Sequence, residues 1–219
     1  MTTTAGGAFN RIANYPPNRK RGRAMFRAFL LLLIVAPSAL LAGEPAPVAQ
    51  LLQSAYAQVG KTVSYDPGYT SIAFPGGDVP IERGVCTDVV VRAYRGIGVD
   101  LQLLVHEDMR AAPGAYPKLW RLSRPDPNID HRRVPNLAVF FARHGKALPI
   151  SKDARDYKPG DIVTWRLSGG LAHIGLVSDK QSGGGRPLVI HNIGAGAQLE
   201  DVLFEFEVTG HYRYRTGVN

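Results

Sequence analysis

The chain has 219 residues, among them 26 Lys and Arg, 18 Asp and Glu and one Cys, and its formal net charge is +8. Six of the basic residues and none of the acidic ones precede residue 43, so the rest of the chain carries a formal charge of only +2. That remainder has no dense Lys/Arg run with interleaved aromatic residues, which argues against a nucleic-acid-binding face. A single Cys also excludes a disulfide-stapled scaffold.

Residues 1–42 are typical of a secretory signal peptide. A basic segment precedes the apolar run 29–36, and small residues follow it. The run falls short of the roughly 20 apolar residues that span a bilayer. An uncleaved anchor and a start at Met25 stay open as alternatives. We therefore expect export to the periplasm or cell envelope, no stable membrane span after processing, and a single domain over 43–219.

Four helices are predicted before residue 150, because apolar residues recur there at helical spacing between start and stop signals. Gly60, Gly96 and Gly145 are stop signals, and Asp100 is a helix cap. The expected helices cover 48–59, 86–95, 101–109 and 137–144. The Gly- and Pro-rich stretch 65–80 is expected to form an irregular surface loop.

From residue 158 onward the pattern changes to short β-branched or aromatic runs separated by Gly, Ser and Asp turns. Such runs predict the strands of an antiparallel meander. Their sequences are "PGDIVTWRL", "LAHIGLVSD", "RPLVIHNIG" and "DVLFEFEVTGHYRY". Because helices come first and strands follow, we expect an α+β fold with N-terminal helices packed on a C-terminal antiparallel β-sheet.

The single cysteine, Cys86, lies in "GVCTDVVV" at the predicted start of a helix. In an exported protein a lone thiol is either an intermolecular linker or a free reactive group. A free cysteine is also often a small buried hydrophobe. A helix N-terminus favours the thiolate, and the unpaired backbone N–H of Cys86 could stabilise an oxyanion there. A nucleophile and a structural core cysteine are therefore the two interpretations to separate.

Two histidines on predicted strands are candidates for the base that activates Cys86. His173 stands in "LAHIGLVSD", where Gly175 leaves the strand face beside the imidazole open. His191 ends the next predicted strand and can orient the ring of His173 and bias its tautomer. From spacing alone, either histidine is equally consistent with a structural role. The three residues are also a conceivable zinc set, although a fourth ligand and a C-x-x-C pair are missing from the sequence.

Three segments, "GVCTDVVVRAYR", "KPGDIVTWRL…LAHIGLVSD" and "VIHNIG", resemble the three motif blocks of the NlpC-type papain-like cell-wall hydrolases. Over residues 50–215 the chain also resembles a bacterial family labelled as a domain of unknown function (number 1287). That wider resemblance includes "YDPGY", "GGDVP", "LVHEDM", "NIDHRRVPNL" and "TGHYRY". It implies a papain-like core in which Cys86 attacks, His173 serves as base and then acid, and His191 orients His173.

Four further residues are candidate substrate contacts, and each has an alternative role. Tyr65 and Tyr69 of "YDPGY" would line the cleft or pin the loop to the core. Asp88 stands where better-studied NlpC-type enzymes usually have Gly, so its carboxylate would bind a substrate amine or repel an anionic stem peptide. Arg132 would pair with a substrate carboxylate or with local backbone and an acidic neighbour.

We therefore expect an exported thiol hydrolase that cleaves an amide bond, with peptidoglycan as the expected substrate. A stem-peptide endopeptidase and an amidase are both compatible with the residues. No cofactor and no metal are expected. Two alternatives stay open: a non-catalytic cell-wall binding or regulatory module, and an acyl hydrolase or transferase that acts on another substrate.

Overall fold

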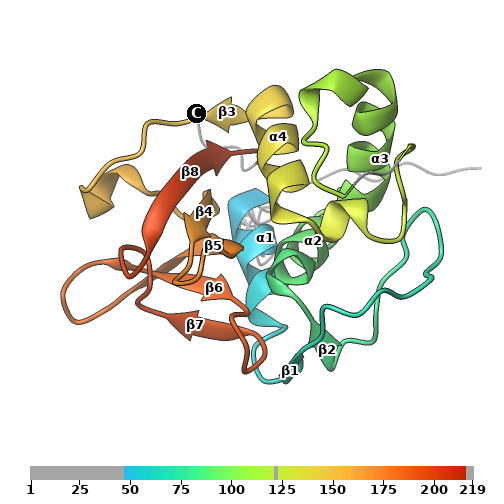
Figure 1. Cartoon of the computed structure of the whole chain (residues 1–219). Helices are drawn as coiled ribbons and strands as arrows, with labels where there is room; N and C mark the ends of the chain where they lie inside the picture. Colours follow the sequence, from blue (N-terminus) through green and yellow to red (C-terminus); the bar gives the residue numbers. More distant parts are fainter. Residues whose placement is uncertain (1–46, 121–122, 216–219) are drawn as a thin grey trace, which may run out of the picture. The chain divides into compact units, whose positions relative to one another are not determined.

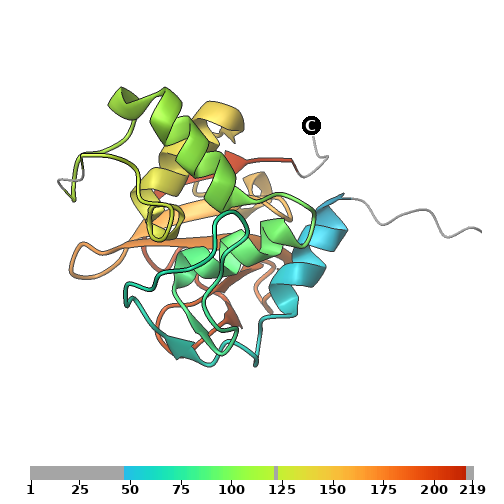
Figure 2. The same ribbon diagram turned by 90° about the vertical axis from the view of Figure 1, so that its right-hand side faces the viewer.

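A computed structural model describes residues 47–120 and 123–215, which all fall within the unit Gly43–Asn219. The predicted leader therefore lies outside the described residues. Figure 1 shows helices gathered on one side of a curved sheet, and Figure 2 shows the same arrangement turned by 90°. No helix among the described residues is long and apolar enough to cross a membrane.

Within residues 47–120 and 123–215, four α-helices and three short 3₁₀ helices form the helical part. The α-helices are α1 (Pro47–Tyr56), α2 (Cys86–Arg95), α3 (Leu101–Ala111) and α4 (Val134–His144). The 3₁₀ helices are η1 (Pro113–Ala115), η2 (Asp130–Arg132) and η3 (Ala154–Asp156). The four predicted helices are confirmed, with α1 ending earlier than expected and α4 beginning earlier, at the residue before Pro135.

Six strands of the described part of the chain form the main sheet, in the order β3-β8-β4-β5-β6-β7, and every neighbouring pair is antiparallel. The strands are β3 (Lys146–Ala147), β4 (Ile162–Arg166), β5 (Ala172–Gln181), β6 (Pro187–His191), β7 (Gln198–Glu200) and β8 (Glu207–Arg213). Strands β4, β5 and β6 form the first three strands of the predicted meander, and β7 is a further strand that was not predicted. The last predicted strand differs, because β8 returns to pair with β4 instead of continuing the meander from β6. A separate parallel pair joins β1 (Ser64–Tyr65) to β2 (Arg83–Gly84).

Apolar residues on the two faces of the sheet belong to two separate clusters. Ile162, Ile174 and Leu176 pack with the helices, together with Cys86. On the other face, Trp165 packs with residues of the segment between β7 and β8, and its indole N–H donates to the carbonyl of Leu203 at 2.9 Å. This arrangement confirms the predicted α+β class.

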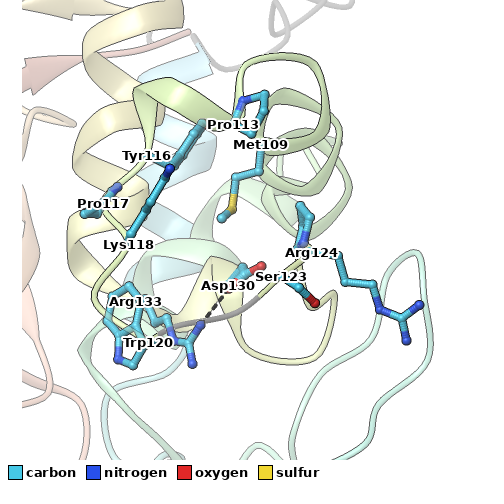
Figure 3. Close-up of a pocket in the computed structure, with 11 residues that line it drawn as sticks. Met109, Pro113, Tyr116, Pro117, Lys118, Trp120, Ser123, Arg124, Asp130 and Arg133 are labelled. Atoms are coloured by element: carbon cyan, nitrogen blue, oxygen red, sulfur yellow. Dashed lines mark hydrogen bonds and ion pairs between the residues drawn. The ribbon is translucent and has the colours of Figure 1, made fainter.

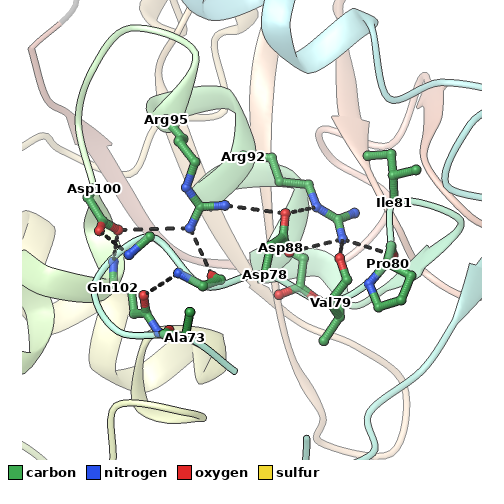
Figure 4. A network of polar contacts seen from close by, with 12 residues as sticks. Ala73, Asp78, Val79, Pro80, Ile81, Asp88, Arg92, Arg95, Asp100 and Gln102 are labelled. Carbon is green, nitrogen blue, oxygen red and sulfur yellow. Dashed lines mark hydrogen bonds and ion pairs between the residues drawn. The ribbon is translucent and has the colours of Figure 1, made fainter. Parts of the chain in front are cut away.

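Helix α2 is held by an arginine that makes nearly every hydrogen bond available to it. Arg92 lies in the last turn of α2 and pairs with both carboxylate oxygens of Asp78, at 2.8 and 3.1 Å. It also donates to the hydroxyl of Thr62 at 3.1 Å and to the carbonyl of Arg83 at 3.0 Å. Figure 4 shows the contacts of Arg92 with Asp78, Val79 and Pro80, which tie the loop before Cys86 to the helix that Cys86 begins.

Candidate active site

Cys86 is the first residue of α2 and follows Val85, whose backbone is extended. Cys86 is buried, with only 3% of its surface exposed. Backbone groups of Ile174 and Thr87 and the hydroxyl of Tyr65 lie within hydrogen-bonding reach of the sulfur. Ile174 directly follows His173 on β5, so the chain brings the thiol beside the strand that carries the imidazole. No hydrogen bond between the sulfur and the His173 ring is found among the described residues.

The environment of Cys86 holds the thiol in its protonated form. Burial raises the pKa of the thiol from an ordinary value of 9.0 to about 11. The backbone contact with Ile174 opposes this increase, and the carboxylate of Asp88 adds to it. The sequence predicted a helix start that favours the thiolate. In the structure, loss of water around the sulfur outweighs the helix terminus, so the resting thiol is neutral at pH 7.

His173 and His191 form a buried hydrogen-bonded pair. Nε2 of His173 lies 2.9 Å from Nδ1 of His191, and the two residues are 2% and 0% exposed. Burial, together with a smaller contribution from repulsion by His191, lowers the pKa of His173 to about 3. Burial also lowers the pKa of His191, against the attraction of Glu200. Both rings are therefore neutral at pH 7. Their predicted proximity is confirmed, whereas their chemical roles stay predictions.

Gly175 explains how the two rings come so close. Strands β5 and β6 pair through Leu176↔Ile190 and Val177↔Val189, which leaves Gly175 opposite His191 on the next step of the ladder. A Cβ atom at Gly175 would lie 2.7 Å from Cγ1 of Val189 and 3.1 Å from Cβ of His191. The open face predicted beside His173 is thus filled by the strand that brings His191.

Two polar residues around His191 were missed by the sequence analysis. Oε2 of Glu200 on β7 lies 2.9 Å from Nε2 of His191. The side chain of Asn192 donates to the carbonyl of Gly84 at 2.9 Å and so ties the end of β6 to the loop that precedes Cys86. A signal for Asn192 was its place beside His191 in "VIHNIG", whereas Glu200 required the register of β6 against β7.

The two predicted tyrosines lie in different surroundings. The hydroxyl of Tyr65 contacts the sulfur of Cys86, and burial, followed by the charges of Cys86 and Asp88, raises the pKa of this phenol. Tyr65 therefore stays protonated and can donate a hydrogen bond beside the thiol. Tyr69 is 61% exposed and bonds to Asp126 at 3.1 Å and to Asn128 at 2.9 Å. These contacts favour the structural interpretation of Tyr69, in which its side chain pins the loop to the core.

Asp88 and Arg132, both candidate substrate contacts in the sequence, bind one another, so Arg132 takes its alternative role of pairing with an acidic residue. Nε and Nη2 of Arg132 each lie 2.9 Å from one oxygen of Asp88, and the two side chains are 2% and 4% exposed. Asp88 also accepts the backbone N–H of Val85 at 2.6 Å. With these partners and this burial, neither residue presents a free charge to a substrate. The geometry instead assigns both residues to holding the first turn of α2.

Two pockets lie near the helical face. One, of about 290 Å³, is shown in Figure 3, where the guanidinium of Arg133 lies 4.1 Å from the ring centre of Trp120. None of the residues that line it belongs to the thiol site. The other, of about 510 Å³, lies between α4 and the sheet and reaches Ala172, the residue before His173. In the described part of the chain, no three or more His, Cys, Asp or Glu residues are arranged to hold a metal ion.

Together, the fold and the site define an α+β protein with a buried thiol at a helix start beside a strand that carries a histidine pair. The family model described as "Domain of unknown function (DUF1287)" matches residues 52–214, and the chain belongs to this family. A relative from Escherichia coli (strain K12), "Uncharacterized protein YijF", is 63% identical over 157 residues. The alignment covers 72% of this chain and 77% of the relative.

Two solved structures from Trichomonas vaginalis, NlpC1 and NlpC2, were also found to be similar. They are 16% and 14% identical to this chain, with TM-scores of 0.44 and 0.42. The alignments cover 79% and 80% of this chain but only 46% and 48% of those chains. The chain thus spans less than half the length of either solved protein.

Proposed function

We propose that this protein is a thiol hydrolase that cleaves an amide bond, with Cys86 as nucleophile and His173 as general base. The observation that carries the proposal is the 2.9 Å contact between Nε2 of His173 and Nδ1 of His191. This contact occupies one nitrogen of His173 and leaves the other, Nδ1, available to accept a proton. A nucleophile, a base and a residue that orients the base are the three parts that such a reaction requires.

The reaction proceeds in two steps. Nδ1 of His173 accepts the thiol proton while the sulfur attacks the amide carbonyl, and the same proton then passes to the departing amine as the C–N bond breaks. This leaves a thioester on Cys86. Water then attacks the thioester carbonyl, gives one proton to His173, and releases the carboxylic acid as the thiol is restored. The backbone N–H of Cys86 and the hydroxyl of Tyr65 are the donors that would stabilise the oxyanion.

The proposed substrate is the peptide part of peptidoglycan, and the proposed location is the periplasm or cell envelope. The support for this is the leader-like composition of residues 1–42 and the resemblance of the three motif blocks to cell-wall hydrolases. A stem-peptide endopeptidase and an amidase differ in the bond that they cut, and the described residues favour neither.

Digestion of purified sacculi tests this proposal. Wild-type protein is expected to release fragments with new termini that mass spectrometry identifies. A new lactyl carboxyl group would indicate an amidase, and a new stem-peptide terminus would indicate an endopeptidase. Cys86→Ala and His173→Ala are expected to release none, while Glu207→Ala, which removes an exposed carboxylate on β8, should act like wild type. Folded wild-type protein that releases no fragment would reject peptidoglycan as substrate.

A non-catalytic binding module is the second candidate function, and one observation favours it. Cys86 is 3% exposed and burial raises its pKa to about 11, as in an ordinary core cysteine. A binding module would sediment with insoluble sacculi, and Cys86→Ala would bind as tightly as wild type. If neither cleavage nor binding occurs, small thioester and acyl-ester substrates should be examined for acyl hydrolysis or transfer.

A further inference from the structure

Glu200 extends the histidine pair into a chain of three groups. Its side chain is 44% exposed, and its Oε2 atom lies 2.9 Å from Nε2 of His191, at an angle outside that of a directional hydrogen bond. That nitrogen is buried and makes no directional hydrogen bond within the described residues. The carboxylate of Glu200 is the polar group that lies beside it. The three groups therefore follow one another in the order Glu200, His191 and His173. The thiol of Cys86 lies beside β5, the strand that carries His173.

The register of the sheet makes this contact possible. On the β6–β7 ladder, His191 stands opposite Gln198, and Glu200 stands opposite Val189. Glu200 is thus a diagonal neighbour of His191 on the same face of the sheet, at a separation that a long side chain can bridge. Its carboxylate reaches inward from solvent to the buried ring.

A carboxylate at the end of this chain determines where every proton lies. The negative charge of a carboxylate 2.9 Å away favours a hydrogen on Nε2 of His191 over a lone pair there, because a carboxylate can only accept. Because a neutral imidazole has one donor and one acceptor, Nδ1 of His191 must then accept from Nε2–H of His173. His173 in turn keeps an unprotonated Nδ1. The opposite order would place a hydrogen on Nδ1 of His173, and that nitrogen could not accept the thiol proton.

We infer that Glu200 is a positioning residue that fixes the tautomers of His191 and His173 and so keeps Nδ1 of His173 basic. This inference rests on the proposed function for its catalytic consequence, but the tautomers themselves do not depend on any substrate. It assigns a role to a residue on the outer strand of the sheet, which neither the motif blocks nor the histidine spacing identified.

Nuclear magnetic resonance of the full chain with ¹⁵N-labelled histidine tests the proton order directly. At pH 7.5 the wild-type spectrum is expected to show the Nε2–H tautomer for both His173 and His191. In Glu200→Ala, His191 should show a mixture of tautomers or the Nδ1–H form, and His173 should change with it. Glu207→Ala is the matched control, since it removes an exposed carboxylate that pairs with Arg166, and it should leave both tautomers unchanged.

Kinetics supply the second readout. Glu200→Ala is expected to lower kcat by about 10- to 100-fold with little change in KM, by analogy with the loss of a partner that orients a metal-binding histidine. Glu200→Gln keeps an oxygen acceptor and should restore part of the rate. Unchanged urea midpoints in all three variants would exclude a loss of folding as the cause.

The outcomes separate this inference from the proposed function. If Glu200→Ala retains the wild-type tautomers of both histidines, the inference is overturned, whatever the activity. If the tautomers change but wild-type protein cleaves no substrate, the proton order stands and the proposed function fails. If the tautomers change while kcat does not, Glu200 sets the order without aiding the reaction, and the positioning role is rejected.

Discussion

Removing Asp88 is expected to destabilise the protein strongly, because it leaves Arg132 as an unpaired buried cation. The Arg132 side chain is 2% exposed and loses two hydrogen bonds of 2.9 Å. Breaking a buried ion pair by deleting one partner typically costs about 3–5 kcal/mol. The lost acceptor for the N–H of Val85 adds roughly 1 kcal/mol, the usual cost of losing a helix cap. Domains are stable by only about 5–15 kcal/mol, so this change removes much of the total.

Urea unfolding of Asp88→Ala, Arg132→Met and the double variant measures the expected loss. The double variant should be more stable than the sum of the two single effects predicts, by at least about 1 kcal/mol, because it leaves no buried charge alone. Glu207→Ala is the control, since its pair with Arg166 is exposed and such pairs contribute about 0–1 kcal/mol. A loss in Asp88→Ala no larger than in this control would refute the reasoning.

The same pair has a consequence for the site. Arg132 also donates to the carbonyls of Gly68 and Asp66, each at 3.1 Å, and so ties the loop that carries Tyr65 to the first turn of α2. Asp88→Ala is therefore expected to alter the contact between Tyr65 and Cys86 as well as stability. Crystallography or the fluorescence of this loop's tyrosines would report the displacement.

Three further outcomes are expected. With a thiol pKa of about 11 instead of 9.0, Cys86 should react with iodoacetamide about 100-fold more slowly at pH 7.5 than unfolded protein does, and a labelling midpoint below pH 8 would contradict this. Burial holds the pKa of His131 at about 4, so the unfolded chain binds a proton below pH 6.5 that the folded chain does not. His131 alone should therefore lower the unfolding free energy by up to about 1.4 kcal/mol per pH unit as the pH falls from 6.5 to 4, in addition to the fall caused by His173 and His191, and His131→Gln should show a shallower fall. Gly175→Ala should cost about 1–3 kcal/mol by pushing β6 from β5, and an equal effect of Ala at exposed Gly183 would count against that cause.

Local patterns in the sequence were sufficient to predict the helices and most of the sheet. Asp100 accepts the N–H of Gln102 at the start of α3, and Gly96 and Gly145 cap α2 and α4, so the predicted ends depend on residues next to them. The return of β8 to β4 could not be predicted in this way. It depends on pairing between residues more than 40 positions apart, which alternation along one strand does not encode.

The residues of the candidate site also divide into those that local sequence predicts and those that depend on long-range pairing. Cys86 at a helix start and His191 on the strand after His173 follow from spacing and turn residues. The pairing of Asp88 with Arg132 links positions 44 residues apart, and both residues look like free surface charges in the sequence. The proximity of Glu200 to His191 depends on the β6–β7 register. The partners of the buried polar and charged side chains therefore could not be predicted from the sequence.

The two pKa values at the site limit how the proposed reaction can begin. A thiol pKa of about 11 and an imidazole pKa of about 3 place the thiolate–imidazolium pair roughly 11 kcal/mol above the neutral pair, before the two charges attract one another. A preformed ion pair is therefore disfavoured in the unliganded site. The sulfur must lose its proton as it bonds to the carbonyl carbon, when charge passes to the substrate oxygen. Only an unprotonated nitrogen on His173 can accept the thiol proton at that moment. The tautomer that Glu200 imposes on His173 therefore matters more here than in a site whose thiolate forms before the substrate binds.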